Sequence, residues 1–241
     1  MTKGLFIIGT DTEVGKTVVA AGILYLLLKK GYRAAYFKPV ASGTMMDGGR
    51  RMPADAAFVF AASGFREDVT VVTPFSFSPE VSPHLAARMT GRAIDREIIL
   101  RALSALKDRY DVIVGEGAGG LLVPLNDEGW LQEKLIRDMG FSCLLVSRAG
   151  LGTINATLLT LRGARAAGLN VKGIVISGAG DSLIEQDNIA MIKKLSGIES
   201  IFVVPRISGL SPQTLQIGDL HDVFEKSISA EQIVSLVDDI G

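Results

Sequence analysis

A nine-residue segment near the N-terminus carries the residue types that bind a polyphosphate. It runs from Gly9 to Thr17 as GTDTEVGKT, between an apolar run and a helix-forming segment. In such a loop, backbone N–H groups surround the phosphates, the lysine contacts the outer phosphates and the hydroxyl ligates Mg²⁺. The first glycine, Gly9, lies one residue earlier than in the usual pattern, so Thr10 occupies the position where that pattern has glycine. The loop predicts a nucleotide site, and its nucleotide-binding residues are Glu13, Val14, Gly15, Lys16, Thr17 and Val18.

A second lysine and two acidic residues are candidates for the same site. Lys38 follows a predicted strand, Glu116 ends another, and Asp55 lies beyond the next loop. Two lysines beside one polyphosphate favour a transfer step, because fixed cations stabilise the charge that develops on a phosphoryl group and its acceptor. Mg²⁺ takes oxygen ligands, usually one or two carboxylates besides phosphate and water. We therefore expect Thr17, Asp55 and Glu116 to hold the metal; each carboxylate alone is also compatible with a surface position or a helix cap.

The elements that must position these residues alternate along the chain. Such alternation predicts an α/β fold of three layers, with a mostly parallel central sheet flanked by helices, as in phosphate-loop NTPases. Ligands bind such sheets at the carboxyl ends of the strands. Strands are expected at 4–9, 33–37, 111–115, 142–147, 171–176 and 200–204. Helices are expected at 16–30, 54–62, 82–90, 95–109, 130–138, 153–167, 184–196 and 229–239.

The segment 39–56 has no clear helical or strand periodicity and is rich in glycine. This composition is typical of a mobile loop that crosses the active edge of the sheet. Arg50 and Arg51 within it are candidates to close over phosphates, although a solvated connection explains them equally well.

Composition restricts the class of protein. The 241 residues are expected to form a single domain, 1–241, with no membrane span, since 48% of them are apolar but no apolar run is long enough to cross a bilayer. The net charge of −1 provides no attraction for nucleic acid. The N-terminus enters the phosphate loop without a signal peptide, which predicts a cytoplasmic location. Cys143 lies in an apolar run and is expected to be buried in a strand.

Six segments over residues 1 to about 176 form an ordered set: Gly9–Thr17, Lys38–Gly43, Asp55, Ser82–His84, Glu116–Gly120 and Leu151–Asn155. The glutamate in the phosphate loop and the KPVASG string are the most specific of them. In their order and similar spacing these segments resemble the dethiobiotin synthetase family.

This resemblance implies an ATP- and Mg²⁺-dependent cyclo-ligase of biotin biosynthesis. The family carboxylates 7,8-diaminopelargonic acid with CO₂ and closes the ureido ring, giving dethiobiotin, ADP and phosphate through a carbamate and a carbamic–phosphoric anhydride. It also implies a homodimer in which the partner subunit binds the carboxylate tail of the substrate. The residues that the resemblance assigns to catalysis are Lys38, Lys16, Thr12 and Glu13. Those that it assigns to the substrate are Thr12, Lys38, Ser42, Pro83, Gly117, Ala118, Gly119, Gly120, Leu151, Gly152 and Asn155.

The resemblance weakens after residue 176. Family members commonly have an Asn-Asp pair that contacts the adenine base, whereas this chain has Ser177-Gly178. A serine satisfies fewer hydrogen bonds of a base than an amide does, so base selectivity is expected to be relaxed. Pro205 and Arg206 are expected to flank the base.

Two alternatives share the phosphate loop. One is a dimeric switch ATPase, a class with an extra lysine early in the loop where this chain has Asp11. The other is an amide-forming ligase for a larger acid, as in cobalamin synthesis, which often carries a glutamine-hydrolysing cysteine in a context unlike that of Cys143.

Overall fold

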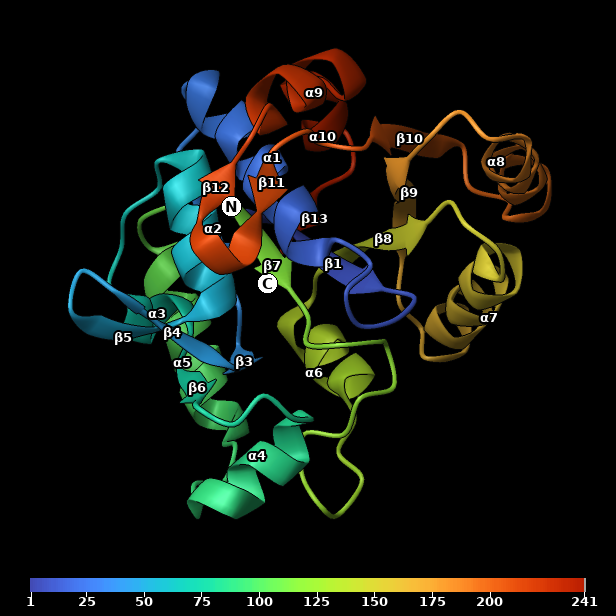
Figure 1. The fold of residues 1–241 in the computed structure, drawn as a ribbon. Coiled ribbons are helices and arrows are strands. Elements are labelled where there is room, and N and C mark those ends of the chain that lie inside the picture. The colour runs from blue at the N-terminus through green and yellow to red at the C-terminus, as the bar shows by residue number, and fades with distance from the viewer. Residues whose placement is uncertain (241) are drawn as a thin grey trace.

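The computed structural model describes residues 1–240, and its centre is a parallel sheet (Figure 1). The strand order is β10-β9-β8-β1-β7-β2, and the short strand β13 pairs antiparallel with the start of β1. The strands of this sheet are β1 (Lys3–Gly9), β2 (Ala34–Phe37), β7 (Val112–Glu116), β8 (Ser142–Arg148), β9 (Val171–Ala179), β10 (Ser200–Pro205) and β13 (Asp238–Asp239).

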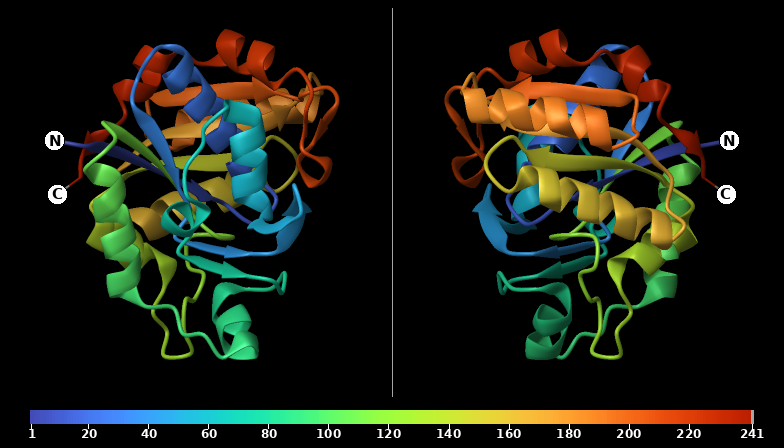
Figure 2. Two further views of the ribbon diagram at one scale, coloured as in Figure 1. Left: turned by 90° about the vertical axis from the view of Figure 1, so that its left-hand side faces the viewer. Right: turned by 90° about the vertical axis from the view of Figure 1, so that its right-hand side faces the viewer.

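Helices cover both faces of the sheet, which gives three layers (Figures 1 and 2). Helices α1, α9 and α10 lie on one face, α5, α6 and α7 lie on the other, and α8 packs against α7. The longer helices are α1 (Lys16–Lys29), α2 (Ala54–Ser63), α4 (Pro83–Thr90), α5 (Arg96–Lys107), α6 (Gln132–Met139), α7 (Thr153–Ala166), α8 (Leu183–Leu195) and α9 (Leu220–Ser227). Shorter ones are α3 (Val69–Val72), α10 (Ala230–Val234) and the 3₁₀ turn η1 (Pro212–Thr214).

The predicted fold class is confirmed, and all six predicted strands are present. Strand β1 pairs in parallel with β7 on one side and β8 on the other, so the phosphate loop lies at the middle of the sheet edge. Ile7 of β1 is level with Glu116 of β7. Phe37 of β2 is level with Gly115. This register brings Lys38, which follows Phe37, to the level of Glu116.

Two predictions about segments are wrong. Residues 39–56 are not a loop; they form two strands of a hairpin, a third short strand and the start of α2. The predicted helix 229–239 ends at Val234, and β13 follows it, because Asp238 and Asp239 pair with the first two residues of β1, ahead of the β1–β8 pairing that begins at Leu5. The short strands outside the central sheet are β3 (Val40–Ser42), β4 (Thr44–Asp47), β5 (Arg50–Pro53), β6 (Phe75–Phe77), β11 (Leu210–Ser211) and β12 (Gln216–Ile217).

The core lies on both faces of the central strands. Leu5, Ile7 and Ile8 are completely buried on β1. Apolar side chains on consecutive residues are typical of a parallel strand that is covered on both faces. Cys143 is buried on β8, as predicted, and burial raises the pKa of its thiol to about 12.

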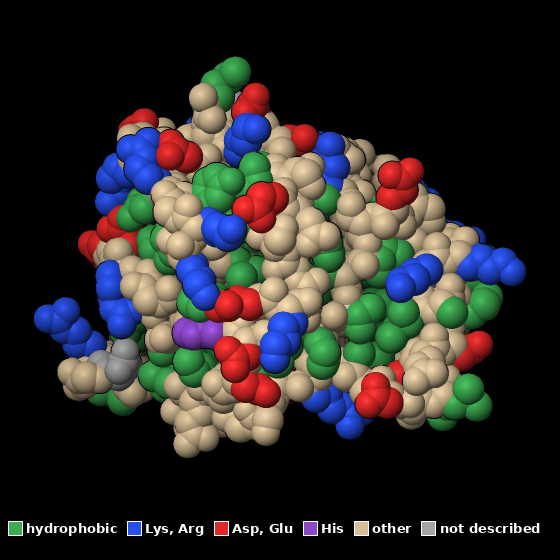
Figure 3. Space-filling model, turned by 90° about the horizontal axis from the view of Figure 1, so that it is seen from above, with side chains coloured by type: hydrophobic (Ala, Val, Ile, Leu, Met, Phe, Trp, Pro, Cys, Tyr) green, Lys and Arg blue, Asp and Glu red, His purple; other side chains and the backbone are tan. Residues whose placement is uncertain are grey.

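Basic and acidic side chains are interspersed on the surface that Figure 3 shows, over the helices α9 and α10. This face has no large patch of one sign. Among residues 1–240, no helix is both long and apolar enough to cross a membrane.

Candidate active site

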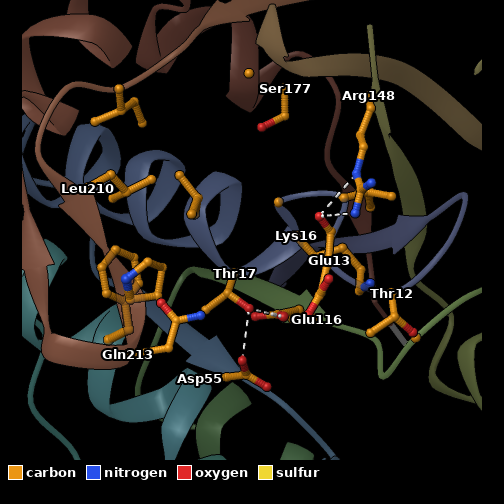
Figure 4. Close-up of a pocket in the computed structure, with 18 of the residues that line it drawn as sticks. Thr12, Glu13, Lys16, Thr17, Asp55, Glu116, Arg148, Ser177, Leu210 and Gln213 are labelled. Atoms are coloured by element: carbon orange, nitrogen blue, oxygen red, sulfur yellow. Dashed lines mark hydrogen bonds between the residues drawn. The ribbon is translucent and has the colours of Figure 1, made fainter. Parts of the chain in front are cut away.

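An open cleft of about 860 Å³ lies at the carboxyl ends of the strands, where the phosphate loop begins α1 (Figure 4). This volume is within the range of small-molecule sites. Its walls come from segments far apart in the chain, with Thr17 and Asp55 on one side and Arg148 and Ser177 on the other. All six nucleotide-binding residues predicted in the loop, Glu13 to Val18, line this cleft.

The phosphate loop has a backbone that binds anions. Gly15 has φ of 97° and immediately precedes α1, whose N-terminus receives no hydrogen bond from a capping side chain. The first N–H groups of the helix are therefore available to a phosphate. Glu13 also has a positive φ, 57°, which is uncommon for a residue other than glycine. The Arg148 guanidinium donates to the carbonyl of Glu13 at 2.9 Å and supports this conformation.

Lys16 folds back onto its own loop. Its Nζ donates to the carbonyl of Asp11 at 2.8 Å, and its side chain is buried. Burial and the nearby charge of Lys38 lower the pKa of Lys16 to about 8. A phosphate in the loop would supply the negative charge that this buried ammonium lacks.

Three oxygen-bearing side chains meet at the base of the cleft. The Thr17 hydroxyl lies 2.7 Å from Oε1 of Glu116 and 3.0 Å from Oδ1 of Asp55. A hydroxyl has a single hydrogen and can donate it to only one of these carboxylates at a time. Two carboxylates around one hydroxyl therefore match the oxygen ligands of Mg²⁺. Among the side chains that the structure describes, no group of three or more His, Cys, Asp or Glu is arranged to hold a metal ion.

Lys38 joins the two carboxylates. Its Nζ lies 2.6 Å from Oδ2 of Asp55 and 2.7 Å from Oε1 of Glu116, and its side chain is only 4% exposed. Burial by itself lowers the pKa of Lys38, but the attraction of Asp55 and Glu116 outweighs it and raises that pKa. The pKa of Asp55 is lowered, since Lys38 and Thr17 outweigh the effect of its burial. Lys38 therefore stays protonated beside the phosphate loop.

Comparison with known proteins identifies the family. An AAA domain family model matches residues 3–214. The ATP-dependent dethiobiotin synthetase BioD of Clostridium novyi is 44% identical over 86% of this chain and 89% of its own length. That of Clostridium kluyveri is 38% identical over 97% and 98%. The chain belongs to the dethiobiotin synthetase family.

Two solved structures share the fold of this chain. The MinC:MinD cell division protein complex of Aquifex aeolicus aligns with a TM-score of 0.63 over 100% of this chain and 98% of the other, at 13% identity. MinD of Pyrococcus horikoshii, solved with Mg-ADP, aligns with a TM-score of 0.58 over 98% and 94%, at 18% identity. Identities this low establish a shared fold and nothing about activity.

The other expected substrate residues divide into two groups. Thr12, Ser42, Ala118 and Gly119 line the cleft. Several others are outside its lining: Gly117 and Gly120 belong to the same loop as Ala118, Pro83 begins α4, and Leu151, Gly152 and Asn155 lie at the start of α7. Leu151 is 94% exposed, so in a single chain its side chain is not part of an enclosed site that could hold a substrate tail.

The expected base-binding residues also line the cleft. Ser177, Pro205 and Arg206 line it together with Glu185. Arg206 is fixed by an ion pair of 2.9 Å to Glu185. Ser177 is so close to the phosphate loop that a Cβ on Gly15 would lie 2.6 Å from its hydroxyl oxygen.

The two arginines of the segment 39–56 do not line the cleft. Arg51 instead lies near the hydroxyls of Thr44 and Ser78, at 3.4 and 3.3 Å. The hairpin thus holds this side chain away from the phosphate loop.

Three residues that hold parts of the site in place belong to no motif recognised in the sequence. Arg148 holds Glu13, as described above. Gln132 is buried and fixes the loop 117–120, because it accepts from Ala118 N–H at 2.7 Å and donates to the carbonyl of Gly120 at 3.0 Å. Tyr36 is completely buried on β2 and contacts Glu116. Of these, only Arg148 follows a predicted strand at the active edge, a position that points to the site.

Proposed function

We propose that this protein is an ATP-dependent cyclo-ligase that closes the ureido ring of dethiobiotin. The observation that supports it most is the group Thr17, Lys38, Asp55 and Glu116 beside the phosphate loop, in which Lys38 and Glu116 are buried. A purely nucleotide-binding protein has no need for a second buried lysine beyond that of the loop. A ligase needs it, because its acceptor is an anion that must approach the γ-phosphate.

The proposed reaction has three steps. One amine of 7,8-diaminopelargonic acid attacks CO₂, forming an N–C bond and losing a proton, which gives a carbamate. A carbamate oxygen then attacks the γ-phosphorus of ATP, ADP leaves, and a carbamic–phosphoric anhydride results. The second amine attacks the carbonyl carbon, the C–O bond to phosphate breaks, and the nitrogen loses a proton as the ring closes.

The lysines supply fixed positive charge in this scheme. Lys16 would turn from the Asp11 carbonyl to the outer phosphates, and Lys38 would face both the γ-phosphate and the carbamate. Thr17, Asp55 and Glu116 would hold Mg²⁺, which neutralises charge on the phosphate oxygens when bound. Positioning and electrostatics account for most of such catalysis, since phosphoryl transfer needs little covalent help from the protein.

The diamine would lie between the phosphate loop and the loop 117–120. Thr12, Glu13 and Ser42, which line the cleft, would contact it, and the Glu13 carboxylate would be a suitable partner for an ammonium group. The exposed residues 151–155 would bind the carboxylate tail of the substrate in a second copy of the chain, at the N-terminus of α7. The active unit is then a homodimer, with residues 1–241 acting as a single domain in the cytoplasm.

The base would lie between Ser177 and Arg206. Ser177 offers one hydroxyl to a base edge, so discrimination between nucleotides is expected to be weak. Pro205 and Arg206 would flank the ring of the base.

A direct assay tests this function. The pure protein is incubated with diaminopelargonic acid, ¹³C-bicarbonate, Mg²⁺ and each nucleoside triphosphate in turn, and the product is analysed by mass spectrometry. Dethiobiotin labelled in its ureido carbon is the expected product, formed at similar rates with several nucleotides. Absence of product from protein that still binds nucleotide would reject the ligase and favour a switch ATPase.

A further inference from the structure

Tyr36 has a hydroxyl group that packing alone does not require. The residue lies on β2 with no exposed surface, and Val114 of the neighbouring strand β7 is level with it. Its Oη donates to Oε2 of Glu116 at 2.6 Å. A phenylalanine would fill the same space, so the hydroxyl serves this one hydrogen bond. Its short length and its charged acceptor place it among the stronger hydrogen bonds in proteins.

The three partners of Glu116 divide between its two oxygens. Oε1 accepts from Thr17 at 2.7 Å and from Lys38 at 2.7 Å, whereas Oε2, among the side chains that the structure describes, accepts only from Tyr36. Glu116 is completely buried, so no bulk water reaches Oε2 to replace a lost donor. Tyr36 thereby fixes the plane of the carboxylate and directs Oε1 toward the cleft.

We infer that Tyr36 is a positioning residue for the metal site, acting through Glu116. This inference rests on the proposed function, in which Glu116 helps to hold Mg²⁺. Groups that orient a metal ligand commonly affect metal affinity by 10- to 100-fold when they are removed. Tyr36 touches neither nucleotide nor substrate in this scheme, so its effect is on the affinity for the Mg²⁺ complex of the nucleotide and not on that for the nucleotide alone.

The test uses Tyr36→Phe and the matched control Tyr110→Phe. Tyr110 also donates its hydroxyl to a glutamate, Glu67, at 2.8 Å, but that pair does not line the cleft. Isothermal titration calorimetry gives the Kd for ADP with excess Mg²⁺ and with EDTA, and the ratio of the two is the gain due to Mg²⁺. We expect Tyr36→Phe to reduce this gain about tenfold and to leave the affinity in EDTA unchanged, while Tyr110→Phe keeps both.

Each other outcome overturns the inference. A Tyr36→Phe protein with lower thermal stability but the gain of the wild type would assign Tyr36 a purely structural role. A wild-type protein with no gain from Mg²⁺ would reject the proposed metal site and this inference together. A wild-type gain that persists in Tyr36→Phe rejects the inference alone.

Should Tyr36→Phe not fold, nuclear magnetic resonance of the wild-type protein provides the test. The phenolic proton of Tyr36, which is completely buried, is followed in ¹³C-tyrosine-labelled protein. We expect its resonance to shift when Mg²⁺ is added to the ADP complex, and an unchanged resonance would contradict the inference.

Discussion

The substitution Lys38→Met tests the central charge arrangement. Methionine retains much of the length of the lysine side chain but leaves Asp55 and Glu116 without their shared cation. The lysine side chain is 4% exposed and that of Glu116 is fully buried, so water does not compensate. Removing one partner of a buried ion pair costs about 3–5 kcal/mol of the free energy of unfolding. We expect a loss in this range, and a loss of ligase turnover with nucleotide binding largely retained.

Denaturant unfolding with and without Mg²⁺ measures this effect. Because Mg²⁺ can supply the missing positive charge between the carboxylates, it should stabilise Lys38→Met more than it stabilises the wild type. The control is Lys30→Met, since Lys30 pairs with Glu231 at 3.2 Å and both side chains are more than half exposed. Such exposed pairs contribute about 0–1 kcal/mol. A loss for Lys38→Met no larger than that of the control, or unchanged turnover, would refute this reasoning.

Three further predictions concern the Cys143 thiol, the phosphate loop and the loop 117–120. The pKa of Cys143 is raised from 9.0 to about 12, so the unfolded chain releases this proton at lower pH than the folded one and stability falls above pH 9. Denaturant unfolding should show that, between pH 8 and 10, the free energy of unfolding of the wild type falls by about 1.4 kcal/mol more than that of Cys143→Ala. The same dependence on pH in both proteins would contradict the buried thiol. Gly15→Ala should abolish binding of a fluorescent nucleotide, because φ is 97° and the new methyl group would clash with Ser177; retained affinity would show that the loop adapts. Gln132→Leu should raise KM for the diamine more than it lowers kcat, as the loop 117–120 loses both of its side-chain anchors; steady-state rates check this, and an unchanged KM would remove the loop from the diamine site.

The sequence was sufficient for the sheet and for most of the cleft. The phosphate loop, the strand-helix alternation and the positions of Lys38 and Glu116 at strand ends all follow from local patterns, and the parallel order brings them together. Residues 39–56 were misinterpreted because a hairpin of short strands has little alternation, and its pairing depends on contacts outside the segment.

Tertiary contacts account for what the sequence did not indicate. Tyr36 and Gln132 occupy an apolar strand and a helix start, where neither residue type is unusual. Their roles come from partners about 80 and 14 positions away, Glu116 and Ala118. The helix expected at 229–239 ended early because β13 pairs with the first two residues of β1, which precede the pairing of β1 with β8, and no local pattern records this contact.

Oxygen transfer from CO₂ tests the proposed ring closure most directly. The protein is mixed with diaminopelargonic acid, ATP, Mg²⁺ and C¹⁸O₂ in a single rapid turnover, and dethiobiotin and phosphate are analysed by mass spectrometry. If Lys38 and the phosphate loop bring a carbamate oxygen to the γ-phosphorus, one ¹⁸O remains in the ureido carbonyl and one leaves with phosphate. Labelled dethiobiotin with unlabelled phosphate would contradict the anhydride route.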